Sequence, residues 1–138
     1  MKILRISIYN TKKSKQDIGL NDDLLRGIWN YGFEEPSPIQ QRAVLPMKMG
    51  KDVIGQAQSG MGKTATFTMG TLESVDTSLN VCQVIILENT REMVLQTANV
   101  VRQLGDYMDI KVHEMYGKSS IHESIQILKK GVHIVVGT

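Results

Sequence analysis

A glycine-containing segment at residues 57–64, Ala-Gln-Ser-Gly-Met-Gly-Lys-Thr, constrains the fold of this chain more than any other feature. Residues 52–56 before it predict a short buried strand, and residues 65–69 after it predict the start of a helix. A strand, a glycine-containing turn and Gly-Lys-Thr at a helix start are the arrangement of a phosphate-binding loop. The segment therefore predicts a nucleotide site. The alternative is an ordinary strand-to-helix turn with an incidental lysine.

Each part of this predicted loop has a physical role in holding phosphate. Gly60 and Gly62 permit backbone conformations and close approach that a side chain would block. Successive N–H groups then line one concavity, and the start of the helix adds further N–H groups and a partial positive charge. We expect Lys63 to reach the β- and γ-phosphates and Thr64 to bind a bridging Mg²⁺, so these two are the candidate catalytic residues and Thr64 is the candidate metal ligand. The other loop residues predicted to bind nucleotide are Ala57, Gln58, Ser59 and Met61.

Length and composition restrict the class of protein. The chain has 138 residues, 41% hydrophobic and 22% charged, which is typical of one globular domain or part of one. No apolar run is long enough to span a membrane, so we expect no membrane partner. Cys82 is the single cysteine, which excludes an internal disulfide, and the three histidines are scattered rather than grouped as metal ligands.

Positive charge is concentrated at the amino-terminal end. The first fifteen residues contain five basic residues and no acidic one, whereas the remainder contains 11 basic and 14 acidic residues. We expect residues 1–18 to form a basic, flexible arm. Such an arm is either a solvated tail or a contact to nucleic acid.

From residue 52 onward, short apolar runs alternate with stretches of helical periodicity. The predicted strands lie near residues 53–54, 83–87, 111–115 and 132–136, and the predicted helices at residues 63–74, 91–104 and 121–130. This alternation predicts an α/β fold with a parallel sheet covered by helices on both faces. We expect four strands in that sheet.

Two helices are predicted before the loop. Asn21 is the expected N-cap of the first, which ends at Gly32. Ser37 and Pro38 are the expected cap and first residue of the second, which Pro46 bends or ends.

Two motifs together resemble the DEAD-box RNA helicases. Residues 32–40, Gly-Phe-Glu-Glu-Pro-Ser-Pro-Ile-Gln, resemble the family's Q motif, G-F-x-x-P-x-x-I-Q. Residues 57–64 resemble its motif I, A-x-x-G-x-G-K-T, which also accounts for Ala57. Further short segments resemble the initiation factor 4A subfamily, and they lie at residues 24–28, 31–33, 40–43 and 104–108. The resemblance extends from about residue 19 to residue 138.

The resemblance implies a P-loop RecA-like lobe, with residues 19–50 as a Q-motif helical region and residues 51–138 as the first part of the ATP-binding lobe. It implies an RNA-stimulated ATP hydrolase that unwinds or remodels RNA in translation initiation or RNA processing. The implied cofactors are ATP and Mg²⁺. The implied partners are RNA, bound through its phosphates, and scaffold proteins of translation initiation. The implied location is the cytoplasm, with the nucleus as the alternative.

Two residues of the Q motif are implied contacts to adenine. A glutamine carboxamide can accept from the adenine N6–H and donate to N7, and Gln40 would do this while Phe33 stacks on the base. Considered without the resemblance, Gln40 is more ordinarily a solvent-facing helix residue, and Phe33 a core residue after a helix end.

The resemblance also implies contacts to RNA phosphates, with three differences from the family pattern. The implied RNA-binding residues are Thr90, Arg91, Gly117 and Thr138. Asn89 replaces the proline of motif Ia, and Glu88 places an acid where a small neutral residue is usual. Lys118 replaces the second glycine of a Gly-Gly pair, where it either adds a phosphate contact or fills space.

The family's D-E-A-D motif is not found in residues 1–138. That motif supplies the acid that binds Mg²⁺ and the carboxylate that positions water. We therefore expect an incomplete lobe, truncated before the D-E-A-D motif, that does not hydrolyse ATP by itself. Two other functions stay open: a non-catalytic fragment or degenerate paralogue that binds nucleotide or a partner, and a different P-loop enzyme such as a nucleotide kinase. The Q motif disfavours the kinase.

Overall fold

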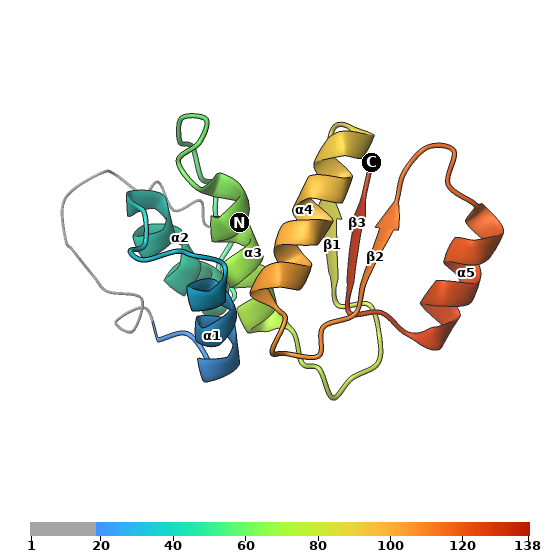
Figure 1. Ribbon diagram of the computed structural model, residues 1–138, viewed down its shortest axis with the longest axis horizontal. Helices are drawn as coiled ribbons and strands as arrows, with labels where there is room; N and C mark the ends of the chain where they lie inside the picture. Colours follow the sequence, from blue (N-terminus) through green and yellow to red (C-terminus); the bar gives the residue numbers. More distant parts are fainter. Residues whose placement is uncertain (1–18) are drawn as a thin grey trace. The chain divides into compact units, whose positions relative to one another are not determined.

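The computed structural model describes residues 19–138, which form two compact units that divide between Ser74 and Val75 (Figure 1). Each unit is described by itself. The predicted basic arm at residues 1–18 lies outside the described residues, and the predicted division at residue 50 stays a prediction. No helix in residues 19–138 has the length and apolar character needed to cross a membrane.

The first unit contains three helices, α1 (Asp22–Asn30), α2 (Pro38–Lys48) and α3 (Lys63–Ser74). Helix α3 packs against both α1 and α2. The buried apolar side chains of this unit are Leu20, Leu24, Ile28, Ala43, Val44, Ala65, Met69 and Leu72.

The predicted helix ends of this unit are mostly confirmed. Asn21 caps α1, because its side-chain oxygen accepts from the Leu24 N–H at 2.8 Å. The chain leaves α1 through Gly32, whose φ is +89°. Ser37 and Pro38 begin α2 as predicted, but α2 continues to Lys48, so Pro46 lies inside the helix and does not end it.

The strand predicted at residues 52–56 is wrong. The described residues have only an isolated β-bridge at Val53 there and no strand element, and Ile54 is 65% exposed. A parallel strand is stable when neighbouring strands pair with its edges and helices cover its faces. An apolar run alone does not supply those neighbours.

The second unit contains a parallel sheet of three strands, β1 (Val84–Leu87), β2 (Val112–Met115) and β3 (Ile134–Gly137). Their order is β1-β3-β2, so β3 is central and all four of its residues are buried. We expected four strands in this sheet, whereas the sheet in the described residues has three.

Helices α4 (Arg91–Leu104) and α5 (Ile121–Lys130) lie on opposite faces of this sheet (Figure 1). Successive residues of a strand point to opposite faces. On β2, Glu114 binds Arg102 of α4, whereas the neighbouring His113 places Nε2 3.0 Å from Ser124 Oγ of α5. The predicted parallel sheet with helices on both faces is confirmed.

Candidate functional site

The predicted phosphate loop lies in the first unit and ends where α3 begins. Gly60 and Gly62 both have φ of +81°, a backbone conformation that other residues rarely adopt. The Met61 N–H donates to the Gln58 carbonyl at 3.3 Å, which closes the turn between them. A compact turn with two such glycines at a helix start is a backbone that can present several N–H groups to one anion.

The Lys63 ammonium group folds back over this loop. It donates to the Ala57 carbonyl at 2.5 Å and to the Gln58 carbonyl at 3.0 Å, while the residue as a whole is exposed. The positive charge is therefore held beside the loop backbone, where an incoming phosphate can take over the ammonium hydrogen bonds. Thr64 is half-buried in the first turn of α3 and is the loop's hydroxyl group next to Lys63.

Gln40 packs directly against the loop. Its side chain is buried, with the residue 2% exposed, and its Oε1 accepts from the Ser37 N–H at 2.9 Å. A Cβ added to Gly62 would lie 2.8 Å from Gln40 Nε2 and 3.3 Å from Ser37 Oγ. A side chain on residue 62 would therefore force the Gln40 carboxamide to move, and the interpretation of Gln40 as a solvent-facing residue is wrong.

The Ser37 hydroxyl is a second polar group at this contact. Its Oγ is buried and belongs to a capping box at the start of α2, in which the Ser37 side chain faces the backbone N–H of Gln40. The Ser-x-x-Gln spacing of a capping box is the sequence signal that would have predicted the bond between Ser37 and Gln40. The beginning of α2 thus brings a carboxamide and a hydroxyl to the end of the loop.

Phe33 lies apart from this contact, after α1. Its ring centroid is 4.8 Å from that of Tyr31, with the planes inclined at 42°, and the residue is half-buried. The Phe33 N–H donates to the Ile28 carbonyl at 3.3 Å. Its predicted role in base stacking stays a prediction.

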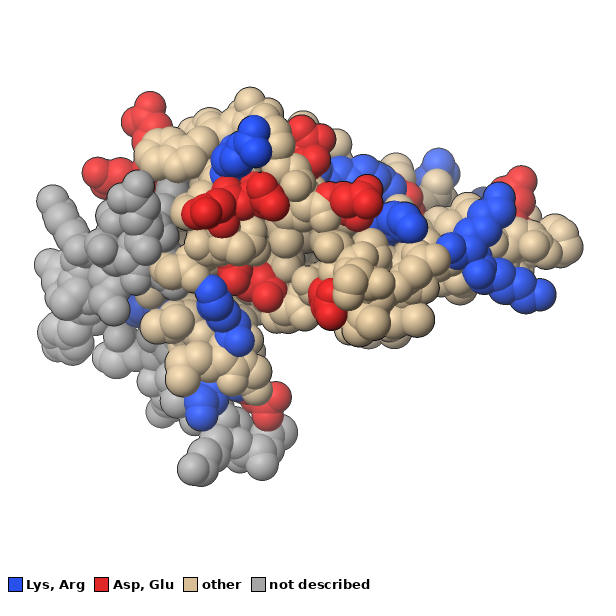
Figure 2. Space-filling view, turned by 90° about the horizontal axis from the view of Figure 1, so that it is seen from below, with Lys and Arg blue, Asp and Glu red and all other residues tan. Residues whose placement is uncertain are grey.

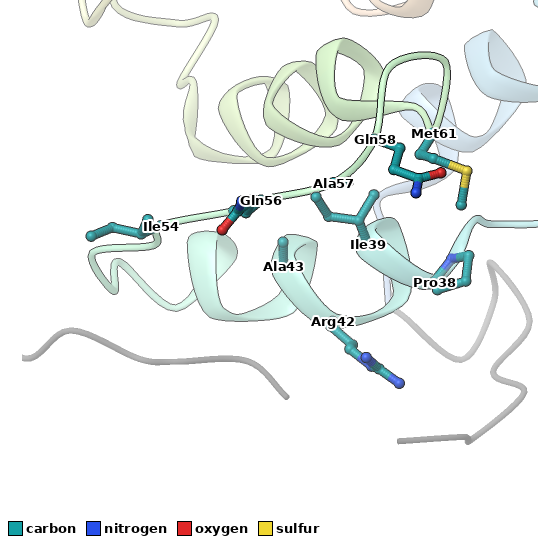
Figure 3. Close-up of a pocket in the computed structure, with 10 residues that line it drawn as sticks. Pro38, Ile39, Arg42, Ala43, Ile54, Gln56, Ala57, Gln58 and Met61 are labelled. Carbon is teal, nitrogen blue, oxygen red and sulfur yellow. The ribbon is translucent and has the colours of Figure 1, made fainter. Parts of the chain in front are cut away.

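A cavity of about 500 Å³ lies between α2 and the segment that leads into the loop (Figure 3). Its lining residues are Pro38, Ile39, Arg42, Ala43, Ile54, Gly55, Gln56, Ala57, Gln58 and Met61. Three of these, Ala57, Gln58 and Met61, are predicted nucleotide-binding residues, whereas Gln40 and Phe33 are not part of the lining. The cavity depends on how α2 and the loop segment pack, and the sequence carries no local signal for it.

The predicted RNA-binding residues lie in the second unit, where they meet at the carboxyl edge of the sheet. Thr90 and Arg91 follow β1, Gly117 follows β2 and Thr138 follows β3. Thr90 caps α4, with its Oγ1 accepting from the Met93 N–H at 3.2 Å. Because parallel strands end at the same edge, these loops are neighbours in the order β1-β3-β2.

The structure shows three further features at this edge. The Arg91 guanidinium carbon lies 4.8 Å from the centre of the Tyr116 ring. Glu88 accepts from Thr97 Oγ1 at 2.6 Å. Lys118 has φ of +72°, the left-handed conformation that favours glycine.

Charge on the surface is mixed. Figure 2 shows Lys and Arg side chains interspersed with Asp and Glu over much of this face, and a group of adjoining basic side chains at the right of the view.

The comparison with known proteins agrees with this geometry. The family model described as DEAD/DEAH box helicase matches residues 37–138. The chain belongs to this family. It is 52% identical over 122 residues to eukaryotic initiation factor 4A of Drosophila melanogaster, covering 88% of this chain and 30% of that protein. It is 54% identical over 121 residues to eukaryotic initiation factor 4A-1 of Arabidopsis thaliana, covering 88% of this chain and 29% of that protein.

Solved structures of DEAD-box proteins have the same fold. A DEAD box protein from Methanococcus jannaschii superposes with a TM-score of 0.84 at 34% identity, covering 91% of this chain and 34% of that one. A variant of S. cerevisiae Dbp5 bound to RNA and ADP BeF3 gives a TM-score of 0.78 at 34% identity, covering 91% and 32%. The predicted RecA-like fold and the resemblance to initiation factor 4A are confirmed. The chain spans less than a third of the length of these two initiation factors.

Proposed function

We propose that this chain is the ATP-binding part of a DEAD-box RNA helicase that remodels RNA in translation initiation or RNA processing. The observation that carries the proposal is the contact between the Q motif and the phosphate loop. Gln40 is buried, and its carboxamide lies so near Gly62 that a Cβ on residue 62 would displace it. Two motifs far apart in sequence thus form one site, in a chain of the DEAD/DEAH box helicase family.

In the proposed site, the loop holds the phosphates of ATP. The Lys63 ammonium exchanges its bonds to the Ala57 and Gln58 carbonyls for bonds to phosphate oxygens. Thr64 supplies a hydroxyl to Mg²⁺, which when bound neutralises phosphate charge. The donor set fits this role because the turn has two glycines at positive φ, a lysine and a threonine at a helix start.

The base is proposed to lie near the start of α2. Gln40 would read the adenine edge, and Phe33 would stack on the base. Gln40 Oε1 accepts from the Ser37 N–H at 2.9 Å, so reading adenine requires the carboxamide to share that bond or release it.

RNA is proposed to bind through its phosphates at the carboxyl edge of the sheet. The residues proposed for it are Thr90, Arg91, Gly117 and Thr138, which lie at adjacent strand ends. Scaffold proteins of translation initiation are further proposed partners. We propose a cytoplasmic location, with the nucleus as the alternative, on the ground of the similarity to initiation factors.

A polypeptide of these 138 residues is proposed to bind ATP without hydrolysing it. No D-E-A-D segment occurs in residues 1–138, so the acid that would position the attacking water is not among them. Phosphate release should stay at background with or without single-stranded RNA. A clear RNA-dependent rate, lost in Lys63→Ala, would contradict this part of the proposal.

Calorimetric titration with ATP and ADP tests the nucleotide site. Lys63→Ala should weaken binding about 10- to 150-fold, because a hydrogen bond to a charged group contributes about 1.5–3 kcal/mol. Lys51→Ala is the matched control, since Lys51 is exposed and lies outside the loop. Circular dichroism verifies that both variants fold. Equal affinities for Lys63→Ala and Lys51→Ala would remove the loop from the site and refute the proposed function.

A further inference from the structure

Arg91 and Tyr116 form a contact across the carboxyl edge of the sheet. Arg91 is the first residue of α4 and follows β1, whereas Tyr116 follows β2. The central strand β3 lies between these two strands, and the guanidinium carbon is 4.8 Å from the ring centre. The pair therefore joins two loops over the end of the third strand.

The frame that carries this pair is tied together by backbone hydrogen bonds. The Glu88 N–H donates to the Gly137 carbonyl at 2.8 Å, and the Thr138 N–H donates to the Met115 carbonyl at 3.1 Å. These two bonds connect the ends of β1 and β2 to the end of β3. The positions of Arg91 and Tyr116 are thus fixed relative to each other by the sheet itself.

The turn after β2 also holds the tyrosine in place. The Tyr116 carbonyl accepts from the Ser119 N–H at 3.0 Å and from Ser119 Oγ at 2.7 Å. Tyr116 is half-buried, whereas Arg91 is exposed. The Tyr116 backbone is therefore anchored by the turn, and its ring is less exposed than the arginine that lies over it.

An aromatic ring under a guanidinium has a specific consequence for phosphate binding. A cation over the ring face is attracted to it, which reduces the number of side-chain conformations the arginine samples. The N–H donors of a guanidinium lie in its plane, so its edges stay available for a bidentate bond to phosphate. Ordering the guanidinium before RNA arrives lowers the entropic cost of that bond.

We propose that Tyr116 is a positioning residue that holds the Arg91 guanidinium for an RNA phosphate. The inference rests on the proposed RNA-binding function of this edge. Tyr116 acts through Arg91 and does not itself stack on a base, because the cation already lies over its ring and the residue is half-buried. Direct stacking of an RNA base on Tyr116 is the rival that the experiment separates.

The test measures fluorescence anisotropy of labelled oligouridine with the full chain and its variants. Tyr116→Leu, which removes the ring but keeps apolar bulk, should weaken binding about 2- to 5-fold, the equivalent of an exposed cation–π contact of about 0.5–1 kcal/mol. Tyr116→Phe keeps the ring and should bind like the unaltered chain. Tyr107→Leu, at an exposed tyrosine elsewhere in the same unit, is the control and should leave the affinity unchanged.

A double-mutant cycle with Arg91→Ala identifies how Tyr116 acts. Arg91→Ala should reduce the slope of log affinity against log salt by about 0.7, the value for one phosphate contact on a single strand. If Tyr116 acts through Arg91, adding Tyr116→Leu to Arg91→Ala should change the affinity no further. Arg91→Lys leaves the ring intact and keeps the charge without the planar fork, so it should also weaken binding.

The possible outcomes separate this inference from the proposed function. No binding of oligouridine by the unaltered chain overturns the RNA role of this edge and the inference with it. If the unaltered chain binds oligouridine and Tyr116→Leu binds it with the same affinity, the inference alone is overturned. The same holds if Arg91→Lys binds with the affinity of the unaltered chain. A loss from Tyr116→Leu that persists in the Arg91→Ala background shows direct contact of the ring with RNA and also overturns it.

Discussion

Glu73 connects the three helices of the first unit, and replacing it tests how that unit is held together. It lies in the last turn of α3, and its side chain is only 3% exposed. One oxygen, Oε1, accepts from the Asn21 N–H at 2.5 Å and from Asn21 Nδ2 at 3.1 Å, at the start of α1. The other, Oε2, is 3.0 Å from the Lys48 ammonium at the end of α2.

The expected loss follows from these partners. Removing one member of a buried ion pair costs about 3–5 kcal/mol, because the remaining polar groups lose their bonds. Lys48 is 37% exposed, so water solvates part of its charge and the two bonds from Asn21 account for most of the loss. Asn21 is exposed as well, so we expect Glu73→Ala to destabilise the first unit by about 2 kcal/mol, below the cost for a fully buried pair.

Urea denaturation followed by tryptophan fluorescence measures this loss directly. Trp29 is the single tryptophan and lies in α1, so its signal reports on the first unit. Glu73→Ala should lower the urea midpoint by at least about 1 M, and Glu73→Gln, which keeps an acceptor oxygen, should lower it less. Arg26→Gln is the control, because its pair with Asp23 is exposed and should contribute under about 1 kcal/mol. An equal effect of Glu73→Ala and Arg26→Gln would refute the reasoning.

Three further predictions concern base choice, backbone strain and pH. Gln40→Ala should weaken ATP binding about 2- to 10-fold, because one neutral hydrogen bond to adenine is lost, and should change GTP binding little. A competition titration with both nucleotides measures this difference. Equal weakening of ATP and GTP binding would mean that Gln40 only supports the fold. Lys118→Gly should raise the free energy of unfolding of the second unit by about 1 kcal/mol, because Lys118 has φ of +72°; a lower urea midpoint for the variant would contradict this. The hydrogen bond from Arg102 lowers the pKa of Glu114 below its ordinary value of 4.5, so the stability it contributes is fully present above pH 4.5 and is lost as the pH falls through the lowered value. Arg102→Gln should therefore reduce the loss of stability below pH 4.5, and identical pH profiles for both proteins would refute this cause.

The helices were largely predictable from the sequence because their signals are local. The predicted ranges 63–74, 91–104 and 121–130 match α3, α4 and α5. Caps such as Asn21 and stops such as Gly131 act within a few residues of the helix they bound. The strand predicted at residues 52–56 failed because pairing depends on distant neighbours, which an apolar run does not reveal.

The features of the candidate sites also differ in whether local sequence signals predict them. The backbone of the loop was predictable, since Gly60 and Gly62 have the positive φ that their place in the motif requires. The contact between Arg91 and Tyr116 was not, because it follows from the strand order β1-β3-β2. No spacing in the sequence encodes which loops become neighbours at the edge of a sheet.

Lys118, in the turn after β2, has a strained backbone conformation and also carries a positive charge. Lys118 adopts a left-handed conformation that costs a non-glycine residue about 1–2 kcal/mol. The turn tolerates this cost because Ser119 donates two hydrogen bonds to the Tyr116 carbonyl. Strain of this kind persists where surrounding contacts fix the conformation, and it is concentrated at functional sites. A lysine at this position adds a cation to the edge that already carries Arg91. The backbone conformation does not distinguish a phosphate contact at Lys118 from a residue that fills space, so that contact stays a prediction.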